Sequence, residues 1–254
     1  MSVRRPLVGA HRGASALETE NTIAAFTRAI EIGADLIEFD VRRTADGRLV
    51  IFHDEDVGGR RIADLTLAEL PDAAGGVPVP TLAETLAATR GRIELDVELK
   101  EPGYEDEVVA EVRDGFGLDD AAFSSFSVST VAAIAARQPD ARVGLIIDSQ
   151  LESEIDAWRD FMDERGRAPS PVDLLEIVRR SGGSFVAASH QLLALPGFEA
   201  ALASAGYPIY VWTVNDPDVM RRLFADRAIA GVLSDHPDLA LQVRAEVLGE
   251  GSAP

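Results

Sequence analysis

Short runs of apolar and β-branched residues alternate with amphipathic segments along the whole chain. The expected strands are Leu7–Ala10, Asp35–Val41, Ile93–Leu99, Ala122–Ser127, Arg142–Ile147, Ser184–Ser189, Pro208–Val214 and Gly231–Ser234. Apolar positions three or four residues apart predict helices over Asn21–Gly33, Thr81–Arg90, Glu105–Phe116, Ser129–Gln138, Pro196–Gly206, Pro217–Arg227 and Asp238–Val247. Strands that alternate with helices are parallel and joined by crossovers. Eight such units in 254 residues predict an α/β fold, a (β/α)8 TIM barrel, and we expect residues 1–254 to form a single domain.

The second expected strand is followed by another extended run rather than by a helix. The two runs flank Thr44-Ala45-Asp46-Gly47, and an Asp-Gly dipeptide is typical of a hairpin turn. A two-residue turn places His53 opposite Asp40, and a register one step different places Glu38 or its neighbour there instead. Both registers bring a histidine back to the mouth of the barrel beside carboxylates. Residues 54–80, rich in Gly, Pro and Ala, are expected to form a short insertion before the next helix.

Reactive side chains gather at the expected carboxyl ends of the strands, where barrels of this kind place their active sites. In chain order these ends read His11-Arg12-Gly13, Glu38-Phe39-Asp40, His53-Asp54, Glu98-Leu99-Lys100, Ser125-Phe126, Trp212-Thr213-Val214-Asn215 and Asp235. Because successive side chains of a strand point to opposite faces, Glu38 and Asp40 share one face, and so do Glu98 and Lys100. The alternate residues are apolar and suit the helix layer. We therefore expect the charged faces to point into the barrel.

Several carboxylates that converge inside a barrel repel one another unless a cation lies among them. The chain has no cysteine and 4 histidines, so oxygen ligands favour one hard divalent cation, Mg²⁺ or Ca²⁺, over zinc. Each motif alone has an ordinary explanation, since a Glu-x-Asp strand is usually a polar rim and a His-Asp pair a loop cap. Their arrival together at the strand ends of one predicted barrel favours a catalytic site.

The overall charge restricts the partners. A net charge of −19 at pH 7 argues against binding to a nucleic-acid backbone and against stable docking on an anionic membrane. No apolar run approaches the roughly 20 residues that span a bilayer, and the amino terminus lacks the apolar stretch of a signal peptide. We expect a soluble, cytoplasmic protein that acts on a small molecule.

Lysine is used only once. Among 24 Lys and Arg residues, Lys100 is the single lysine. Arginine serves wherever a general surface cation suffices, so a lone lysine indicates a role for a compact ammonium group. The alternative is compositional drift or adaptation to high salt, but the position of Lys100 beside Glu98 favours a functional role.

Taken together, these motifs resemble those of the glycerophosphodiester phosphodiesterase family over essentially the whole chain. They are His11-Arg12-Gly13, Glu20-Asn21-Thr22, Glu38-Phe39-Asp40-Val41, Asp46-Gly47 leading to His53-Asp54, Val79-Pro80-Thr81-Leu82 with Glu84, Glu98-Leu99-Lys100, Ser125-Phe126, Trp212-Thr213-Val214-Asn215, and Asp235-His236-Pro237. The resemblance implies that the metal is held by Glu38, Asp40 and Glu98. It also implies an acid–base pair of His11 and His53, phosphate contacts from Arg12 and Lys100, and packing of Trp212 against the glycerol part of the substrate.

Two segments depart from the family pattern. Thr19 stands where the family usually has proline before Glu-Asn-Thr. The segment Glu55–Arg61 is shorter than the family's arginine-threonine motif and the insertion that follows it over the mouth. The shortening bears on headgroup recognition and leaves the catalytic motifs intact. Residues 150–171 match no motif.

The resemblance implies metal-dependent hydrolysis of glycerophosphodiesters to glycerol 3-phosphate and an alcohol. Histidine suits both proton-transfer roles because its unperturbed pKa of about 6.5 lies near working pH. The nucleophile is either water or a neighbouring glycerol hydroxyl that forms a cyclic phosphate. One alternative is a lysophospholipase D-type phosphodiesterase on the same barrel, although the acidic chain favours a water-soluble diester. Others are a metal-dependent lyase and, from a different class, a catalytically silent barrel that serves as a binding protein.

Overall fold

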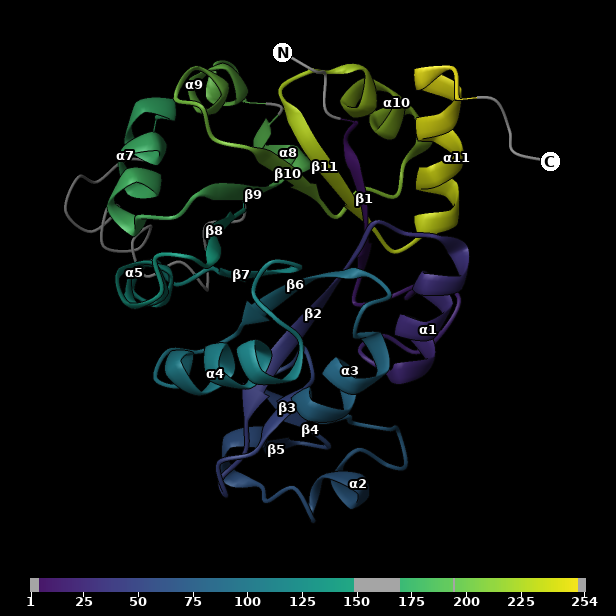
Figure 1. Cartoon of the computed structure of the whole chain (residues 1–254), viewed down its shortest axis with the longest axis vertical. Coiled ribbons are helices and arrows are strands. Elements are labelled where there is room, and N and C mark those ends of the chain that lie inside the picture. The colour runs from purple at the N-terminus through teal and green to yellow at the C-terminus, as the bar shows by residue number, and fades with distance from the viewer. Residues whose placement is uncertain (1–4, 149–169, 194, 251–254) are drawn as a thin grey trace.

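The computed structural model describes residues 5–148, 170–193 and 195–250. Within these ranges, eight parallel strands close into a barrel, because the first strand pairs with both the second and the last (Figure 1). The barrel strands, in chain order, are β1 (Leu7–His11), β2 (Leu36–Arg43), β6 (Glu94–Leu99), β7 (Ala121–Ser125), β8 (Arg142–Ile147), β9 (Phe185–Ser189), β10 (Ile209–Trp212) and β11 (Ile229–Ser234). The predicted TIM barrel is confirmed, and every strand expected from the sequence is present.

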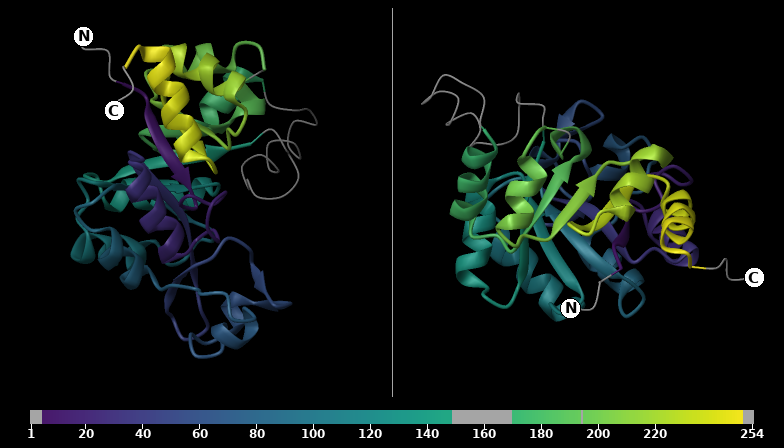
Figure 2. Two further views of the ribbon diagram at one scale, coloured as in Figure 1. Left: turned by 90° about the vertical axis from the view of Figure 1, so that its right-hand side faces the viewer. Right: turned by 90° about the horizontal axis from the view of Figure 1, so that it is seen from above.

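A helix follows each barrel strand and lies outside the barrel, so that helices surround the strands (Figure 2). These helices are α1 (Ile23–Ile32), α3 (Leu82–Thr89), α4 (Glu105–Gly115), α5 (Val128–Arg137), α7 (Pro171–Ser181), α9 (Phe198–Ser204), α10 (Pro217–Ala225) and α11 (Pro237–Leu248), and a short α8 (His190–Leu193) precedes α9. Helix α7 does not correspond to any of the helices predicted from the sequence. The preceding segment without a motif falls mostly outside the described residues.

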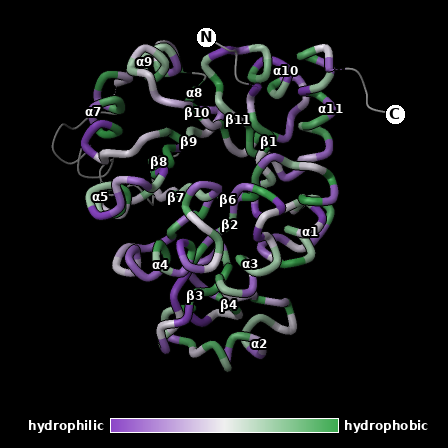
Figure 3. The backbone as a smooth tube through the Cα atoms, viewed as in Figure 1, coloured by the Kyte–Doolittle hydropathy of each residue, from purple (hydrophilic) through white to green (hydrophobic). Residues whose placement is uncertain are grey.

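Local chemistry explains where α1 begins and ends. The Thr22 hydroxyl accepts a hydrogen bond from the backbone N–H of Ala25, and Gly33 adopts a left-handed conformation with φ 87° at the other end. Phe26 of this helix packs on Phe39 of β2, with ring centroids 5.7 Å apart. The apolar face of β2 therefore meets the helix layer, as the strand pattern predicts. Figure 3 shows the corresponding alternation of apolar and polar residues along the outer helices.

Near the amino-terminal ends of the later barrel strands, two glycines make room for aromatic rings. Phe185 and Tyr210 meet edge to face with ring centroids 5.3 Å apart. A Cβ atom at Gly144 would lie 2.1 Å from the Phe185 ring, and one at Gly231 would lie 2.8 Å from Tyr210. Larger residues at these two positions would push the rings out, so the glycines determine how the interior packs.

The predicted hairpin after β2 is present, but its register differs by one residue from the two-residue turn. Strand β3 (Leu49–Ile51) pairs antiparallel with β2. The backbone N–H of Phe52 donates to the carbonyl of Asp40 at 3.0 Å, so Phe52 lies opposite Asp40 and His53 lies one residue beyond. Of the two registers predicted from the sequence, the alternative is confirmed: continued by one residue, the pairing sets His53 opposite Phe39, the neighbour of Glu38, and not opposite Asp40.

A three-residue loop accounts for this register. The Thr44 N–H donates to the carbonyl of Arg48 at 2.9 Å, which leaves Ala45, Asp46 and Gly47 as the loop. Gly47 has φ 75°, a conformation that suits the last residue of such a loop. The Asp46 carboxylate accepts from the Thr44 hydroxyl at 2.6 Å and thereby stabilises the longer turn.

The insertion before α3 projects from the side of the barrel next to β3 (Figure 1). It contains β4 (Asp56–Val57), β5 (Arg60–Arg61), a 3-10 helix (Ile62–Asp64) and α2 (Leu70–Ala73). Its buried apolar side chains form a second small core with β3, made of Val50, Val57, Ile62, Leu65 and Leu70. The insertion is thus anchored by its own packing. In the part of the chain that the structure describes, no helix is both long and apolar enough to cross a membrane.

Candidate active site

Three buried carboxylates meet at the mouth, the carboxyl-terminal end of the barrel strands. Glu38 and Asp40 come from β2 and Glu98 from β6, and the parallel pairing of these strands sets Asp40 beside Glu98. Their exposed fractions are 4%, 1% and 7%. Each offers one oxygen atom to a group in which all three lie within 4.8 Å of one another. The strand alternation predicted this inward face, and the structure brings the three together.

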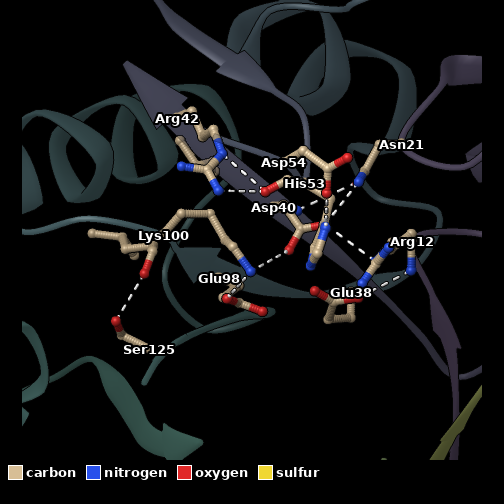
Figure 4. Close-up of polar contacts among 12 residues, drawn as sticks. Arg12, Asn21, Glu38, Asp40, Arg42, His53, Asp54, Glu98, Lys100 and Ser125 are labelled. Carbon is tan, nitrogen blue, oxygen red and sulfur yellow. Dashed lines mark hydrogen bonds and ion pairs between the residues drawn. The ribbon is translucent and has the colours of Figure 1, made fainter. Parts of the chain in front are cut away.

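Asp40 is surrounded by positive and hydrogen-bonding groups (Figure 4). Its oxygens lie 3.4 Å from Lys100 Nζ and 3.4 Å from Arg12 Nε. Asn21 Nδ2 donates to Asp40 Oδ2 at 2.7 Å. Burial alone would raise the pKa of Asp40, but Lys100 and Arg12 outweigh burial and lower it to about 2. Asp40 is therefore ionised at any working pH.

Glu38 and Glu98 have the opposite electrostatic environment. Burial and the nearby Asp40 charge raise the pKa of Glu38 well above its ordinary range. Burial also raises the pKa of Glu98 to about 7, although Lys100 Nζ lies 2.7 Å from one of its oxygens. Glu38 Oε1 is buried without a hydrogen-bond partner. The cluster therefore has more carboxylate than the nearby cations neutralise, and its oxygen donors fit a hard divalent cation.

His11, at the end of β1, is held by the last strand of the barrel. Its Nδ1 lies 2.7 Å from Asp235 Oδ1, and its Nε2 lies 4.0 Å from Glu38 Oε2. Asn215 Nδ2 donates to the other Asp235 oxygen at 2.6 Å, and the Ser15 hydroxyl donates to Oδ1 at 3.1 Å. Burial opposes ionisation of Asp235, but the hydrogen bonds from His11 and Asn215 lower its pKa to about 2. Asp235 thus accepts the Nδ1 proton, and Nε2 of His11 faces the carboxylates.

His53 reaches the same mouth from the segment that follows β3. Its Nδ1 lies 2.7 Å from Asp54 Oδ1, and the side chains of His53 and Asp54 are 32% and 73% exposed. Burial lowers the pKa of His53, an effect that the charge of Asp40 partly opposes. A neutral imidazole is therefore favoured at this position near neutral pH.

The loop after β1 adopts an unusual backbone conformation beside the carboxylates. Arg12 and Asn21 both have φ 56°, a left-handed region that non-glycine residues rarely occupy. The Asn21 N–H donates to the carbonyl of Arg12 at 3.0 Å, and the Arg12 N–H donates to Glu38 at 3.0 Å. Gly13 has φ 83°, and a Cβ there would lie 2.7 Å from the Cβ of Ala25. The loop therefore requires glycine at the third position of the His-Arg-Gly motif, and its conformation places Arg12 at the site.

A cavity of about 230 Å³ opens between these groups. His11, Arg12, Glu38, His53, Glu98, Lys100 and Trp212 all line it, whereas Asp40 is buried behind them. Trp212 meets Phe126 edge to face with ring centroids 5.5 Å apart. Trp212 Nε1 donates to the carbonyl of Ala187 at 3.1 Å, which fixes the indole ring. The cavity therefore has a charged side and an aromatic wall.

Sequence reasoning assigned no individual role at the site to Asn21, Asp235 or Asn215. The predicted helix begins at Asn21, but the structure begins it at Ile23 with Thr22 as the cap, and the Asn21 side chain binds Asp40 instead. Asp235 was expected only as a strand-end residue. Barrel closure could have revealed its partner, because β1 pairs with β11 and Ala10 lies opposite Ser234, so the next residues, His11 and Asp235, are neighbours.

Comparison with known proteins agrees with this geometry. The model of the glycerophosphoryl diester phosphodiesterase family matches residues 11–239. The chain belongs to that family. A glycerophosphodiester phosphodiesterase of Caldanaerobacter subterraneus is 26% identical over 259 residues, which cover 94% of this chain and 98% of the relative. The family makes this protein an enzyme of the phosphodiesterase class.

Solved structures share the architecture. The crystal structure of a glycerophosphodiester phosphodiesterase from Thermotoga maritima is 29% identical, with a TM-score of 0.77, and the match covers 95% of this chain and 99% of that one. An Oleispira antarctica phosphodiesterase, solved with its product sn-glycerol-3-phosphate, is 23% identical with a TM-score of 0.73. That match covers 94% of this chain and 96% of the other, and it shows the same fold.

Proposed function

We propose that this enzyme hydrolyses glycerophosphodiesters to glycerol 3-phosphate and an alcohol, and that it uses one divalent cation, Mg²⁺ or Ca²⁺. The proposal depends mainly on a cluster of three buried carboxylates at a cavity that two histidines and two cations also line. Family membership supports the choice of substrate. A silent binding barrel would have no need for this combination.

Glu38, Asp40 and Glu98 are the proposed metal ligands. A bound divalent cation would supply Lewis-acid stabilisation of the phosphate oxygens as negative charge develops. Arg12 and Lys100 are proposed to bind the same phosphate group and to orient it. Lys100 suits this place because its side chain is only 4% exposed and its ammonium already lies between Glu98 and Asp40, where a planar guanidinium fits less well.

His11 and His53 are the proposed acid–base pair. His11 donates its Nδ1 proton to Asp235, so Nε2 is the atom that takes up or releases a proton during the reaction. His53 approaches from the β3 side, so the two imidazoles can serve opposite sides of a phosphate. We propose Trp212 as the surface against which the glycerol part packs. The net charge of −19 supports a small soluble diester rather than a nucleic acid or a membrane surface as substrate.

The proposal is tested with glycerophosphocholine and lysophosphatidylcholine as substrates, by measuring glycerol 3-phosphate and choline. We expect release of glycerol 3-phosphate from the first substrate, loss of activity in EDTA, and recovery on addition of Mg²⁺ or Ca²⁺. Higher turnover of the lysolipid would identify the lysophospholipase D-type alternative instead.

Histidine variants complete the test. We expect His11→Ala and His53→Ala to lose about 10²- to 10⁴-fold in kcat, the usual contribution of proton transfer. His190→Ala is the matched control, because His190 begins α8 and does not line the cavity. Undiminished activity in either of the first two variants would refute the acid–base assignment.

A further inference from the structure

His53 has little side-chain support, although the proposed chemistry needs its ring in one place. The antiparallel ladder between β2 and β3 has ended by this point, since Phe52 makes the last backbone bond to β2. The imidazole bonds to Asp54, the next residue of the same segment, whose side chain is 73% exposed. Neither contact ties His53 to the barrel.

The contact that connects His53 to the barrel comes from Arg42. Arg42 follows Glu38 and Asp40 on the same face of β2, and its side chain is only 8% exposed. Its Nε and Nη2 atoms both donate to the main-chain carbonyl of His53, at 2.9 and 2.5 Å (Figure 4). Two donors of one rigid fork on a single carbonyl fix both the position and the orientation of that peptide.

The guanidinium of Arg42 is itself held by Glu101, and Glu101 is held by Tyr104; both residues lie in the segment that follows β6. Its remaining nitrogen, Nη1, donates to the carboxylate of Glu101. The other oxygen of Glu101 lies 2.6 Å from the hydroxyl of Tyr104, which in turn lies 2.8 Å from the carbonyl of Val41. The chain of contacts Tyr104–Glu101–Arg42 therefore connects the His53 backbone to β2 and to the segment that follows β6.

A buried arginine is costly unless it is fully paired, so its placement here indicates a specific task. We propose that Arg42 is a positioning residue for His53, which it acts on through the main-chain carbonyl without contacting the substrate. This inference rests on the proposed acid–base role of His53. A displacement of about 1 Å at a reacting group can cost on the order of 10²-fold in rate, so release of this carbonyl should lower turnover.

The test is a double-mutant cycle between Arg42 and His53. Arg42→Met keeps the length and apolar stem of the side chain but removes the donors. We expect about a 10- to 100-fold lower kcat, with KM changed less than about threefold, because the phosphate-binding groups are untouched. In the His53→Ala background the same substitution should cost less than about twofold, because there is no ring left to position.

Matched variants separate positioning from general stability. Arg142→Met removes another arginine of a barrel strand, one paired with Glu94 at 3.1 Å away from the mouth, and should leave kcat unchanged. Arg42→Lys keeps one donor and should recover part of the lost turnover. Glu101→Gln keeps an acceptor for Arg42 and serves as a milder variant if Arg42→Met does not fold.

A second measurement does not depend on activity. The ring signals of His53 in a spectrum of ¹⁵N-histidine-labelled protein, identified by their loss in His53→Ala, should shift and broaden in Arg42→Met, while those of His11 stay in place. An equal loss of kcat in both backgrounds would overturn the inference, and so would an unchanged His53 spectrum. If the protein shows no phosphodiesterase activity but the His53 signals respond, the proposed function fails while the positioning contact stands.

Discussion

The two histidines reach the same carboxylates from supports of different construction. His11 lies in a barrel strand, and its ring is held by Asp235, whose carboxylate accepts further hydrogen bonds from Asn215 and Ser15. His53 follows a three-residue strand, and among the residues that the structure describes its ring bonds only to an exposed neighbour. The contact that ties it to the barrel acts on its backbone.

The two sides of the site therefore hold their histidines by different kinds of contact. On the His11 side, the hydrogen-bond network fixes both the ring and its tautomer, so changes to that network should act on the chemistry of the ring. On the His53 side, the hairpin and Arg42 hold the backbone of the segment, and the ring bonds to an exposed neighbour. We expect the two sides to respond differently to otherwise similar substitutions.

The largest expected effect is common to both sides. Glu98→Gln removes one carboxylate oxygen from the proposed metal site and should lower kcat by at least about 10³-fold, because metal-based charge stabilisation is worth several kcal/mol. Glu94→Gln is the control, since Glu94 lies on the same strand but lines the opposite end of the barrel. Metal titration should show weaker binding only in the first variant. Equal metal affinity in both would remove Glu98 from the ligand set.

The next test distinguishes the roles of the two histidines. His11→Ala and His53→Ala are compared on glycerophosphocholine and on a diester with a p-nitrophenyl leaving group. Such a leaving group departs without protonation, so the variant that lacks the general acid should recover most of its activity and the other should not. Recovery in both variants, or in neither, would contradict a division of labour between acid and base.

A smaller effect is expected from the carboxylates that bond to the two imidazole rings, Asp235 and Asp54. Asp235→Asn keeps the size of the side chain but weakens the orientation of His11, and we expect about a 10- to 100-fold loss of kcat. Asp54→Asn should cost no more than about threefold, because Asp54 is exposed and a surface pair of this kind contributes little. A larger loss in Asp54→Asn than in Asp235→Asn would reverse the comparison.

The smallest effect concerns stability. The pKa of Asp235 falls from 3.8 to about 2 on folding. A lowered pKa contributes stability that is complete above the ordinary value and disappears as the pH falls through about 2. Asp235→Asn should therefore lower the free energy of unfolding near pH 6 by on the order of 1 kcal/mol, allowing for partial exposure, and the difference should shrink towards pH 3. Urea unfolding at several pH values measures it, and a difference that grows on acidification would contradict the assignment.

Much of this molecule follows from local sequence. The alternation of apolar runs and amphipathic segments predicts the barrel, because each β–α unit must bury one apolar face. The two-residue periodicity of a strand places Glu38 and Asp40 on one inward face, and the structure agrees. The helix caps at Thr22 and Gly33 are likewise readable, since capping depends on residues within one turn.

Three features depended on contacts between distant segments. The loop that places His53 one residue beyond Asp40 is also held by the insertion, because the Leu67 N–H donates to Asp46 and the Ala45 N–H donates to the carbonyl of Leu65. The Asp235–His11 contact joins residues 224 positions apart, and it forms only because the last strand closes the barrel against the first. The support of His53 by Arg42 requires the fold to bring a hairpin and two strand ends together.

The barrel, the inward carboxylates and the two histidines could be predicted from the sequence, because all of these depend on short-range periodicity and on position along a strand. How each histidine is held, and which carboxylates are ionised, became visible only in the folded protein. Those properties depend on burial and on neighbours from other strands, which a linear pattern does not contain. The two histidines are visible in the sequence, and the difference between them is visible only in the fold.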